Sequence, residues 1–131
     1  MIALDTNVLV RFLVRDDARQ SALAAALIRR ALEADGHLFV SDIVLCEMVW
    51  VLDAAYRVPR GEISAHLANL LAARHLTFRN PDAARRARDA YEAGKGDFAD
   101  YLIREHAREA GAEDVATFDK VLLRESGYRL P

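Results

Sequence analysis

Residues 38–55 read LFVSDIVLCEMVWVLDAA, a short apolar run, a polar pair and then a long apolar run. The apolar triplet 38–40 predicts a short strand. Ser41 or Asp42 is a typical N-cap residue, so a helix is expected over 43–55. The stretch therefore predicts a strand that passes directly into a helix.

The same alternation recurs along the chain and indicates an α/β protein. Short apolar strands alternating with amphipathic helices favour a parallel sheet covered by helices on both faces. We expect a three-layer α/β/α arrangement with a central parallel sheet, built by one domain over residues 1–131. Strands are predicted at 2–4, 38–40, 76–78, 115–117 and 128–130, and helices at 7–14, 18–32, 43–55, 61–74, 81–93, 97–110 and 120–125.

Composition narrows the classes of protein that remain possible. Hydrophobic residues make up 53% of the chain and charged residues 29%, which is typical of a globular domain and not of a disordered one. No apolar run approaches the roughly 18 residues of a membrane helix, and Asp5 interrupts any export signal. The single Cys46 cannot form an internal disulfide, which agrees with a reducing cytoplasm. The net charge of −2 excludes binding to nucleic acid by overall charge alone.

Two carboxylates follow predicted strands. Asp5 ends the 2–4 strand, and Asp119 follows the 115–117 strand by way of Phe118. Open parallel sheets place their binding crevice outside the carboxyl ends of the strands, so both residues are candidates for a functional site. For Asp5, simple capping of the next helix is the alternative.

Glu47 lies in the nearly all-apolar helix predicted over 43–55. A helix that is apolar on all sides is usually buried, and a buried carboxylate needs a partner, a proton or a metal. The alternatives are an ion pair, for example with Arg11, or extension of the side chain to the surface. Glu47 is therefore a second kind of candidate, chosen because a carboxylate is unexpected in a helix that is otherwise nearly all apolar.

Asp97 and Asp100 open the helix predicted over 97–110, one turn apart and able to share one side of it. Acids at a helix N-terminus are also favoured by the helix dipole, so capping alone is the alternative here.

Carboxylates that converge repel one another, and a hard divalent cation with oxygen ligands relieves this repulsion. The four histidines are scattered and form no zinc pattern with Cys46. An all-oxygen site suits Mg²⁺ or Mn²⁺. The sequence has neither a G-x-S-x-G serine motif nor a phosphate-binding G-x-x-x-x-G-K-[ST] loop.

Four segments in this order resemble the PIN domain, and within it the VapC-type toxin ribonucleases of bacterial toxin–antitoxin pairs. The segments are Leu4-Asp5-Thr6-Asn7, Ser41 followed by Glu47, the run from Asp97 to Ile103 (DFADYLI), and Ala116-Thr117-Phe118-Asp119-Lys120, and the resemblance extends over essentially the whole chain.

The resemblance implies a toxin endoribonuclease that depends on Mg²⁺ or Mn²⁺. It implies cytoplasmic action on RNA, a homodimer, a cognate VapB-like antitoxin and a larger toxin–antitoxin assembly. The family's acidic quartet matches Asp5, Glu47, Asp100 and Asp119, and Asp97 matches an accessory acid. The metal is then expected on Asp5, Asp97 and Asp100, with Thr6, Asn7, Ser41 and Thr117 as supporting polar residues.

Two other functions compete with this interpretation. The first is a non-catalytic interaction module whose acidic pocket binds a basic partner peptide. The second is a phosphatase with Asp5 as nucleophile, although the second aspartate two residues on, which such enzymes use as acid and base, is absent.

The sequence does not identify the residues that would contact RNA. The candidates for contacts with the RNA backbone are four arginines: Arg11, Arg15, Arg79 and Arg85.

Overall fold

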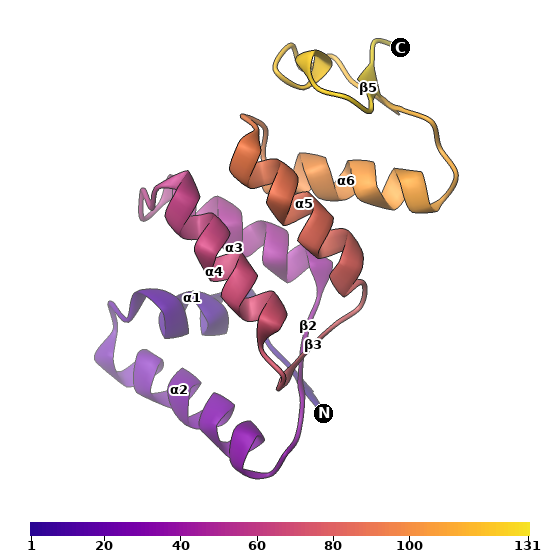
Figure 1. Cartoon of the computed structure of the whole chain (residues 1–131). Helices are drawn as coiled ribbons and strands as arrows, with labels where there is room; N and C mark the ends of the chain where they lie inside the picture. The colour runs from indigo at the N-terminus through magenta and orange to yellow at the C-terminus, as the bar shows by residue number, and fades with distance from the viewer. The chain divides into compact units, whose positions relative to one another are not determined.

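Five short strands, all paired in parallel, organise the fold, and they are shared between two sheets (Figure 1). The computed structural model describes all 131 residues. Contacts within the chain divide it into two compact units, Met1–Arg79 and Asn80–Pro131. Each unit has its own parallel sheet and its own helices.

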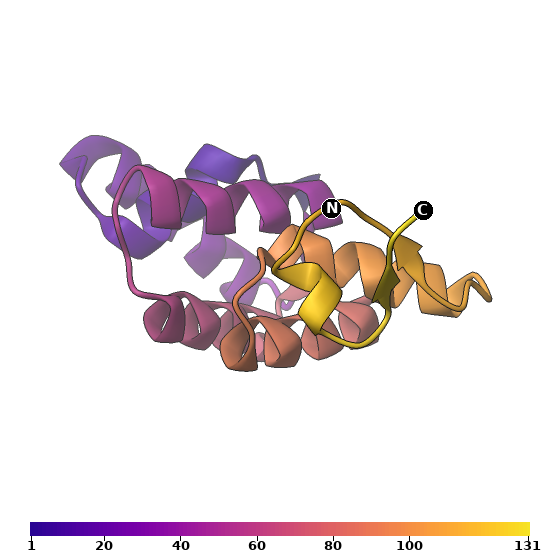
Figure 2. The ribbon, with the colours of Figure 1, turned by 90° about the horizontal axis from the view of Figure 1, so that it is seen from above.

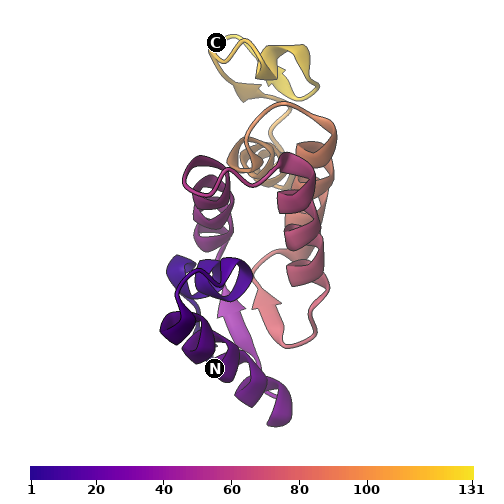
Figure 3. The ribbon, with the colours of Figure 1, turned by 90° about the vertical axis from the view of Figure 1, so that its left-hand side faces the viewer.

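The first unit contains a three-stranded sheet in the order β1-β2-β3. Ile2 pairs with Leu38, and Leu38 pairs with Leu76. Figure 3 shows β2 and β3 as neighbouring arrows that point the same way. The elements of this unit are β1 (Ile2–Ala3), α1 (Thr6–Val14), α2 (Ala18–Glu33), β2 (Leu38–Val40), α3 (Asp42–Ala54), α4 (Arg60–Ala72) and β3 (Leu76–Phe78).

Helix α3 begins where the sequence predicted it, directly after β2. The Ser41 side chain is the N-cap and accepts a hydrogen bond of 3.2 Å from the Val44 N–H. Helix α3 packs on α1, and α1 packs on α2. Their inward side chains, such as Leu9, Leu45 and Met48, are fully buried. These contacts hold α1 and α3 in place. Asp5 lies at the start of α1, and Glu47 lies within α3.

The second unit is built on α5 and α6, which lie side by side (Figures 1 and 2). Its small sheet pairs Val115 with Tyr128. The elements are α5 (Pro81–Ala93), α6 (Phe98–Glu109), β4 (Val115–Ala116), the 3₁₀ helix η1 (Leu122–Arg124) and β5 (Tyr128–Arg129). Asn80 caps α5 by accepting from the Ala83 N–H at 3.2 Å, with Pro81 in the first turn.

These elements confirm the α/β class, the parallel pairing and the presence of helices around a sheet. The expected central sheet occurs as two sheets, one in each unit. The helix predicted over 120–125 shortens to the 3₁₀ turn η1. None of the helices combines the length and apolar character needed to cross a membrane.

The sequence predicted strands in a sheet covered by helices on both faces, and for the first strand this prediction was wrong. Ile2 is 57% exposed, and only Leu4, beyond the end of β1, is buried. The reason is position: β1 is two residues long and lies at the end of its sheet, so its apolar residues are not enclosed as those of the central β2 are.

Candidate functional site

The predicted site residues are divided between the two units. The first unit holds Asp5, Thr6, Asn7, Ser41 and Glu47. The second unit holds Asp97, Asp100, Thr117 and Asp119. Each group has its own local geometry.

Asp5 occupies the N-cap position of α1 in an extended conformation (φ −82°, ψ 160°). Its backbone carbonyl accepts the Val8 N–H at 3.1 Å, but its side chain makes no capping hydrogen bond. The carboxylate is exposed. Capping therefore does not account for the Asp5 side chain, and its oxygens are available to a ligand.

The predicted supporting polar residues of the first unit have different local roles. Thr6 is 6% exposed, and its Oγ1 is buried without a hydrogen-bond partner. A buried hydroxyl of this kind costs free energy unless something binds it. Asn7 is exposed. The Ser41 hydroxyl is engaged by the Val44 N–H as the cap of α3.

Glu47 is exposed, so the prediction of a buried carboxylate was wrong. Helix α3 buries one face, while Ile43 and Trp50, one turn before and after Glu47, are 70% and 62% exposed. Glu47 lies on this exposed apolar face. Arg11, the alternative partner, bonds instead to Gln20, Asp16 and Tyr56. Because α3 has apolar residues on both faces, its sequence could not show which face is covered and which is exposed.

The exposure of Glu47 sharpens a test of its role. Glu47→Gln is expected to change the free energy of unfolding by no more than about 0.5 kcal/mol, because the side chain supports no packing. If Glu47 serves the active site, RNA cleavage should collapse. Glu33→Gln, at an exposed residue of α2, is the control that keeps full activity. Activity retained by Glu47→Gln would remove this residue from the site.

Asp97 and Asp100 form one structural pair at the start of α6. Asp97 is the N-cap residue, in agreement with the capping alternative, and Asp100 lies in the first turn. The Asp100 Oδ2 accepts the Asp97 N–H at 3.1 Å. This bond holds the Asp100 carboxylate next to the helix N-terminus, where the helix dipole favours negative charge.

Negative charge is concentrated around Asp100. Burial raises the pKa of the Asp100 carboxyl, the hydrogen bond from the Asp97 N–H lowers it, and the charges of Asp97, Asp119 and Glu125 raise it further. The net direction is upward. A cation at this position would offset the repulsion and lower the pKa of the carboxyl.

Asp119 is held in the turn that follows β4. Its Oδ1 accepts from the Val121 N–H at 2.8 Å and from the Leu122 N–H at 3.4 Å. Its own N–H donates to the Thr117 Oγ1 at 3.0 Å. Thr117 thus supports Asp119 as a turn residue, and one oxygen of the Asp119 carboxylate is engaged locally.

Two residues close to Asp100, Glu125 and Tyr128, were missed by the sequence analysis. Glu125 contributes charge to the Asp100 environment, and both of its oxygens accept from the Tyr101 hydroxyl. Tyr128 donates its hydroxyl to the Asp100 carbonyl at 2.9 Å. Burial raises the pKa of Tyr128 to about 12, so the phenol stays protonated and remains a donor. Glu125 and Tyr128 lie more than 20 residues from Asp100, and no motif marked them.

The buried carboxylate of this protein is Glu105, another residue that the sequence analysis missed. Glu105 is 2% exposed and is surrounded by Arg86, Arg104 and Arg108. Burial raises its pKa, but hydrogen bonds from Arg104 and Arg86 and the charges of Arg108 and Arg104 lower it, and the net direction is downward. This cluster is an internal ion-pair network. The spacing of Glu105 and Arg108 along α6 was the available signal.

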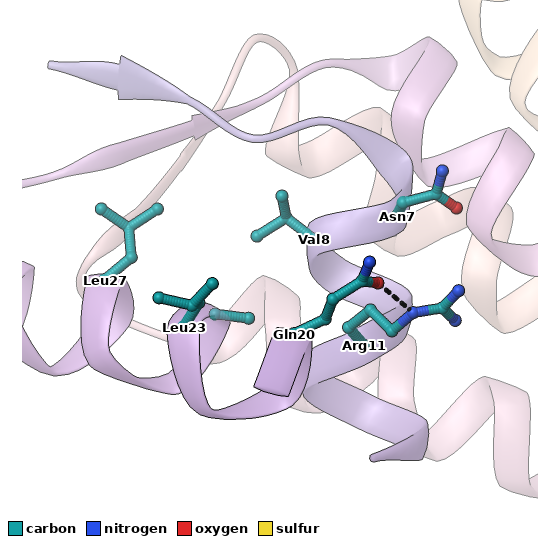
Figure 4. A pocket seen from close by; sticks show the side chains of 7 residues that line it. Asn7, Val8, Arg11, Gln20, Leu23 and Leu27 are labelled. Carbon is teal, nitrogen blue, oxygen red and sulfur yellow. Dashed lines mark hydrogen bonds between the residues drawn. The ribbon is translucent and has the colours of Figure 1, made fainter. Parts of the chain in front are cut away.

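A cavity of about 350 Å³ lies between α1 and α2. In Figure 4 the side chains of Leu23, Leu27 and Val8 line its apolar part. Arg11 and Asn7 mark its polar side, where the Arg11 Nε donates to Gln20 at 2.6 Å (Figure 4). Asn7, which lines the cavity, follows Asp5 by two residues in the chain.

The donor set can be compared with the chemistry of a divalent metal. Within either unit, no group of three or more His, Cys, Asp or Glu side chains lies in a metal-binding arrangement. The chemistry of the candidates nevertheless fits Mg²⁺ or Mn²⁺: the Asp5 carboxylate is not used as a cap, and Asp100 lies in excess negative charge. All the donors are hard oxygens.

The fold and the acidic residues define a class: an α/β protein with carboxylates that follow parallel strands and open a helix. The family model of the PIN domain matches residues 2–126. The chain belongs to the PIN domain family, whose members are generally metal-dependent nucleases. A search of curated proteins finds no match to the chain.

Proposed function

We propose that this protein is an endoribonuclease toxin that hydrolyses RNA phosphodiester bonds with a divalent metal and is neutralised by a cognate VapB-like antitoxin. The observation that carries the proposal is the state of Asp5 and Asp100. The Asp5 carboxylate is not used in capping. The Asp100 carboxylate is held at a helix N-terminus, near other negatively charged side chains. Both belong to segments that resemble the VapC-type motifs.

The division of roles follows from the side chains. Asp5 and Asp100 would hold Mg²⁺ or Mn²⁺, with Asp97 beside them. When bound, such a cation polarises the scissile phosphate and lowers the pKa of water. Glu47 or Asp119 would orient the attacking water and accept its proton. Glu47 is exposed and Asp119 has one oxygen engaged by backbone N–H groups, so Glu47 is the less constrained of the two.

The match over residues 2–126 crosses both units, and we propose that they act as one domain. This matters for the mechanism because each unit alone supplies only part of the acidic quartet. A homodimer and a larger assembly with the antitoxin belong to the same proposal, as does action in the cytoplasm.

The candidate arginines differ in how they are held. Arg11 and Arg85 are paired, with Asp16 and Asp82 respectively. Arg15 lies over the Phe12 ring at 5.7 Å. Arg79 is exposed. Among the four, Arg79 is the one we favour for a contact with the RNA backbone.

The antitoxin needs both an apolar anchor and a cationic group. The exposed face of α3 around Trp50 offers an apolar surface beside Glu47. The cavity between α1 and α2 offers another close to Asp5. An antitoxin helix could dock its apolar side on either surface while a basic residue approaches the carboxylates. Inhibition should then weaken as the metal concentration rises.

The proposal is tested by incubating the purified protein with total cellular RNA in Mg²⁺ or Mn²⁺ and again with a chelator. Cleavage is expected with metal and not with the chelator, most readily at single-stranded loops where bases are exposed. Expression in bacteria should arrest growth with the wild type but not with Asp5→Asn. Identical RNA patterns with and without metal would favour the non-catalytic interaction module.

A further inference from the structure

A chain of hydrogen bonds connects the segment after η1 to the start of α6. The Tyr101 hydroxyl donates to Glu125, with distances of 2.6 Å to Oε2 and 2.9 Å to Oε1. The same hydroxyl accepts the Gly96 N–H at 2.9 Å. Gly96 immediately precedes Asp97, so Glu125 is coupled through one buried phenol to the residue before the acidic pair.

The packing around this chain leaves little freedom. Tyr101 is fully buried. A Cβ atom on Gly96 would lie 2.7 Å from the Leu122 side chain and 3.1 Å from the Tyr101 hydroxyl. A Cβ atom on Gly94 would collide with the same hydroxyl and come within 2.6 Å of Glu125. Because Gly94 and Gly96 have no side chains, the loop can pack directly against the Tyr101 hydroxyl.

A second contact holds the other side of the acidic pair. The Tyr128 hydroxyl donates to the backbone carbonyl of Asp100 at 2.9 Å. The Arg104 guanidinium lies over the rings of Tyr101 and Tyr128, at 5.3 and 5.6 Å from their centres, and donates to the Ser126 carbonyl at 3.1 Å. The C-terminal segment thus reaches the residue before Asp97 through the Tyr101 hydroxyl and contacts the backbone of Asp100 directly.

We propose that Tyr101 and Glu125 are positioning residues that preset the Asp97–Asp100 pair for a divalent cation. The inference rests on the proposed function, in which Asp100 holds the metal. Neither residue is assigned to the metal itself, since both oxygens of Glu125 accept from the Tyr101 hydroxyl. Their role is to fix Gly96 and hence the direction in which Asp97 and Asp100 enter the helix.

The inference predicts that loss of the Glu125 or Tyr101 hydrogen-bonding group lowers the affinity for metal. It also predicts that glutamine in place of Glu125 preserves that affinity. Glu125→Ala and Tyr101→Phe should raise the dissociation constant for Mn²⁺, measured by calorimetry, by about 10- to 100-fold, as loss of outer-shell partners does. Glu125→Gln keeps an oxygen that accepts from Tyr101, so its affinity should stay within about threefold of the wild type, below the roughly 10- to 100-fold loss expected of the other two variants. A charged ligand of the metal would not be rescued in this way.

Amide hydrogen exchange supplies a readout that does not depend on metal or activity. Exchange of the Gly96 N–H and of the Asp97 N–H, which binds the Asp100 carboxylate, should accelerate in Glu125→Ala and Tyr101→Phe. Glu109→Ala is the matched control, because Glu109 also accepts two hydrogen bonds, from Arg86 and Asn80, at the far end of α6. It should lower the melting temperature without changing Mn²⁺ affinity.

Unchanged Mn²⁺ affinity in both variants, with slow exchange at Asp97, would overturn the inference and leave a structural contact only. Equal losses in Glu125→Ala and Glu125→Gln would also overturn it, because they would assign the effect to charge. A wild type that binds Mn²⁺ but cleaves no RNA would refute the proposed function and leave the positioning role standing. A wild type without Mn²⁺ affinity would refute both.

Discussion

Asp100→Asn is expected to lose metal-dependent RNA cleavage by more than about a hundredfold, beyond the effect of losing an outer-shell partner. The same variant should melt at a higher temperature than the wild type in metal-free buffer at neutral pH. Asparagine keeps an oxygen that can accept the Asp97 N–H, so the start of α6 retains its hydrogen bond. What it loses is the charge that Asp97, Asp119 and Glu125 oppose. We expect Asp5→Asn to abolish cleavage as well.

The sign of the stability effect follows from the pKa. Burial and the neighbouring carboxylates raise the pKa of Asp100 above its unfolded value. The native state therefore binds the proton more tightly, and wild-type stability falls as the pH rises from the unfolded pKa through the native one. The amide of the Asp100→Asn variant does not ionise, so the difference between variant and wild type should grow over that acidic range and then remain constant.

The measurements are melting temperature against pH without metal, calorimetric titration with Mn²⁺, and RNA cleavage. Asp114→Asn, at an exposed aspartate of the same unit, is the control and should leave all three unchanged. Full Mn²⁺ affinity in Asp100→Asn would exclude Asp100 as a ligand. A lower melting temperature would show that the carboxylate stabilises the metal-free protein instead.

The element pattern was predictable because its determinants are local. Strand β2 and the cap of α3 follow from three apolar residues and a serine. The start of α5 follows from Asn80 and Pro81, and the N-cap of α6 from Asp97. Asp5, Asp97, Asp100 and Asp119 were found for the same reason, since they come next to strand ends or helix starts. Glu47 was found because it interrupts an apolar helix.

The surroundings of those acids were less predictable because they depend on which face of an element is covered. Helix α3 carries apolar residues on both faces, and the structure leaves Ile43, Glu47 and Trp50 exposed. The buried acid is on α6 instead, in a helix with arginines around it. Charged residues are mostly exposed in proteins, so nothing in the sequence indicated that Glu105 and Arg104 are both buried.

Contacts between distant segments were beyond the sequence analysis. Tyr101 and Glu125 are 24 residues apart, and their contact depends on a close approach at Gly94 and Gly96. Glycine pairs of this kind predict a loop but not the side chain that fills the space beside it. For this reason the acidic residues were identified before the residues that hold them.

Glu105→Ala is expected to give the largest loss of stability of any substitution considered, about 3–5 kcal/mol in the free energy of unfolding. Glu105 accepts from Arg86 at 3.0 Å, from Arg104 at 3.1 Å and from Arg108 at 3.0 Å. Arg104 is itself buried, so removal of the carboxylate leaves a buried guanidinium without its counter-charge. The network also joins α5 to α6, because Arg86 belongs to α5.

Urea unfolding monitored by circular dichroism would measure this loss, with Glu92→Ala as the control. Glu92 pairs with Arg88 at 3.4 Å on the surface of α5, and its removal should cost less than about 1 kcal/mol. The pKa of Glu105 lies below its usual value, so its stabilising effect is complete above the unfolded glutamate pKa and declines as the pH falls through the native one. The gap between Glu105→Ala and wild type should therefore narrow in acid. A gap that stays constant through the acid range would mean that Glu105 stabilises the protein by packing and not by charge.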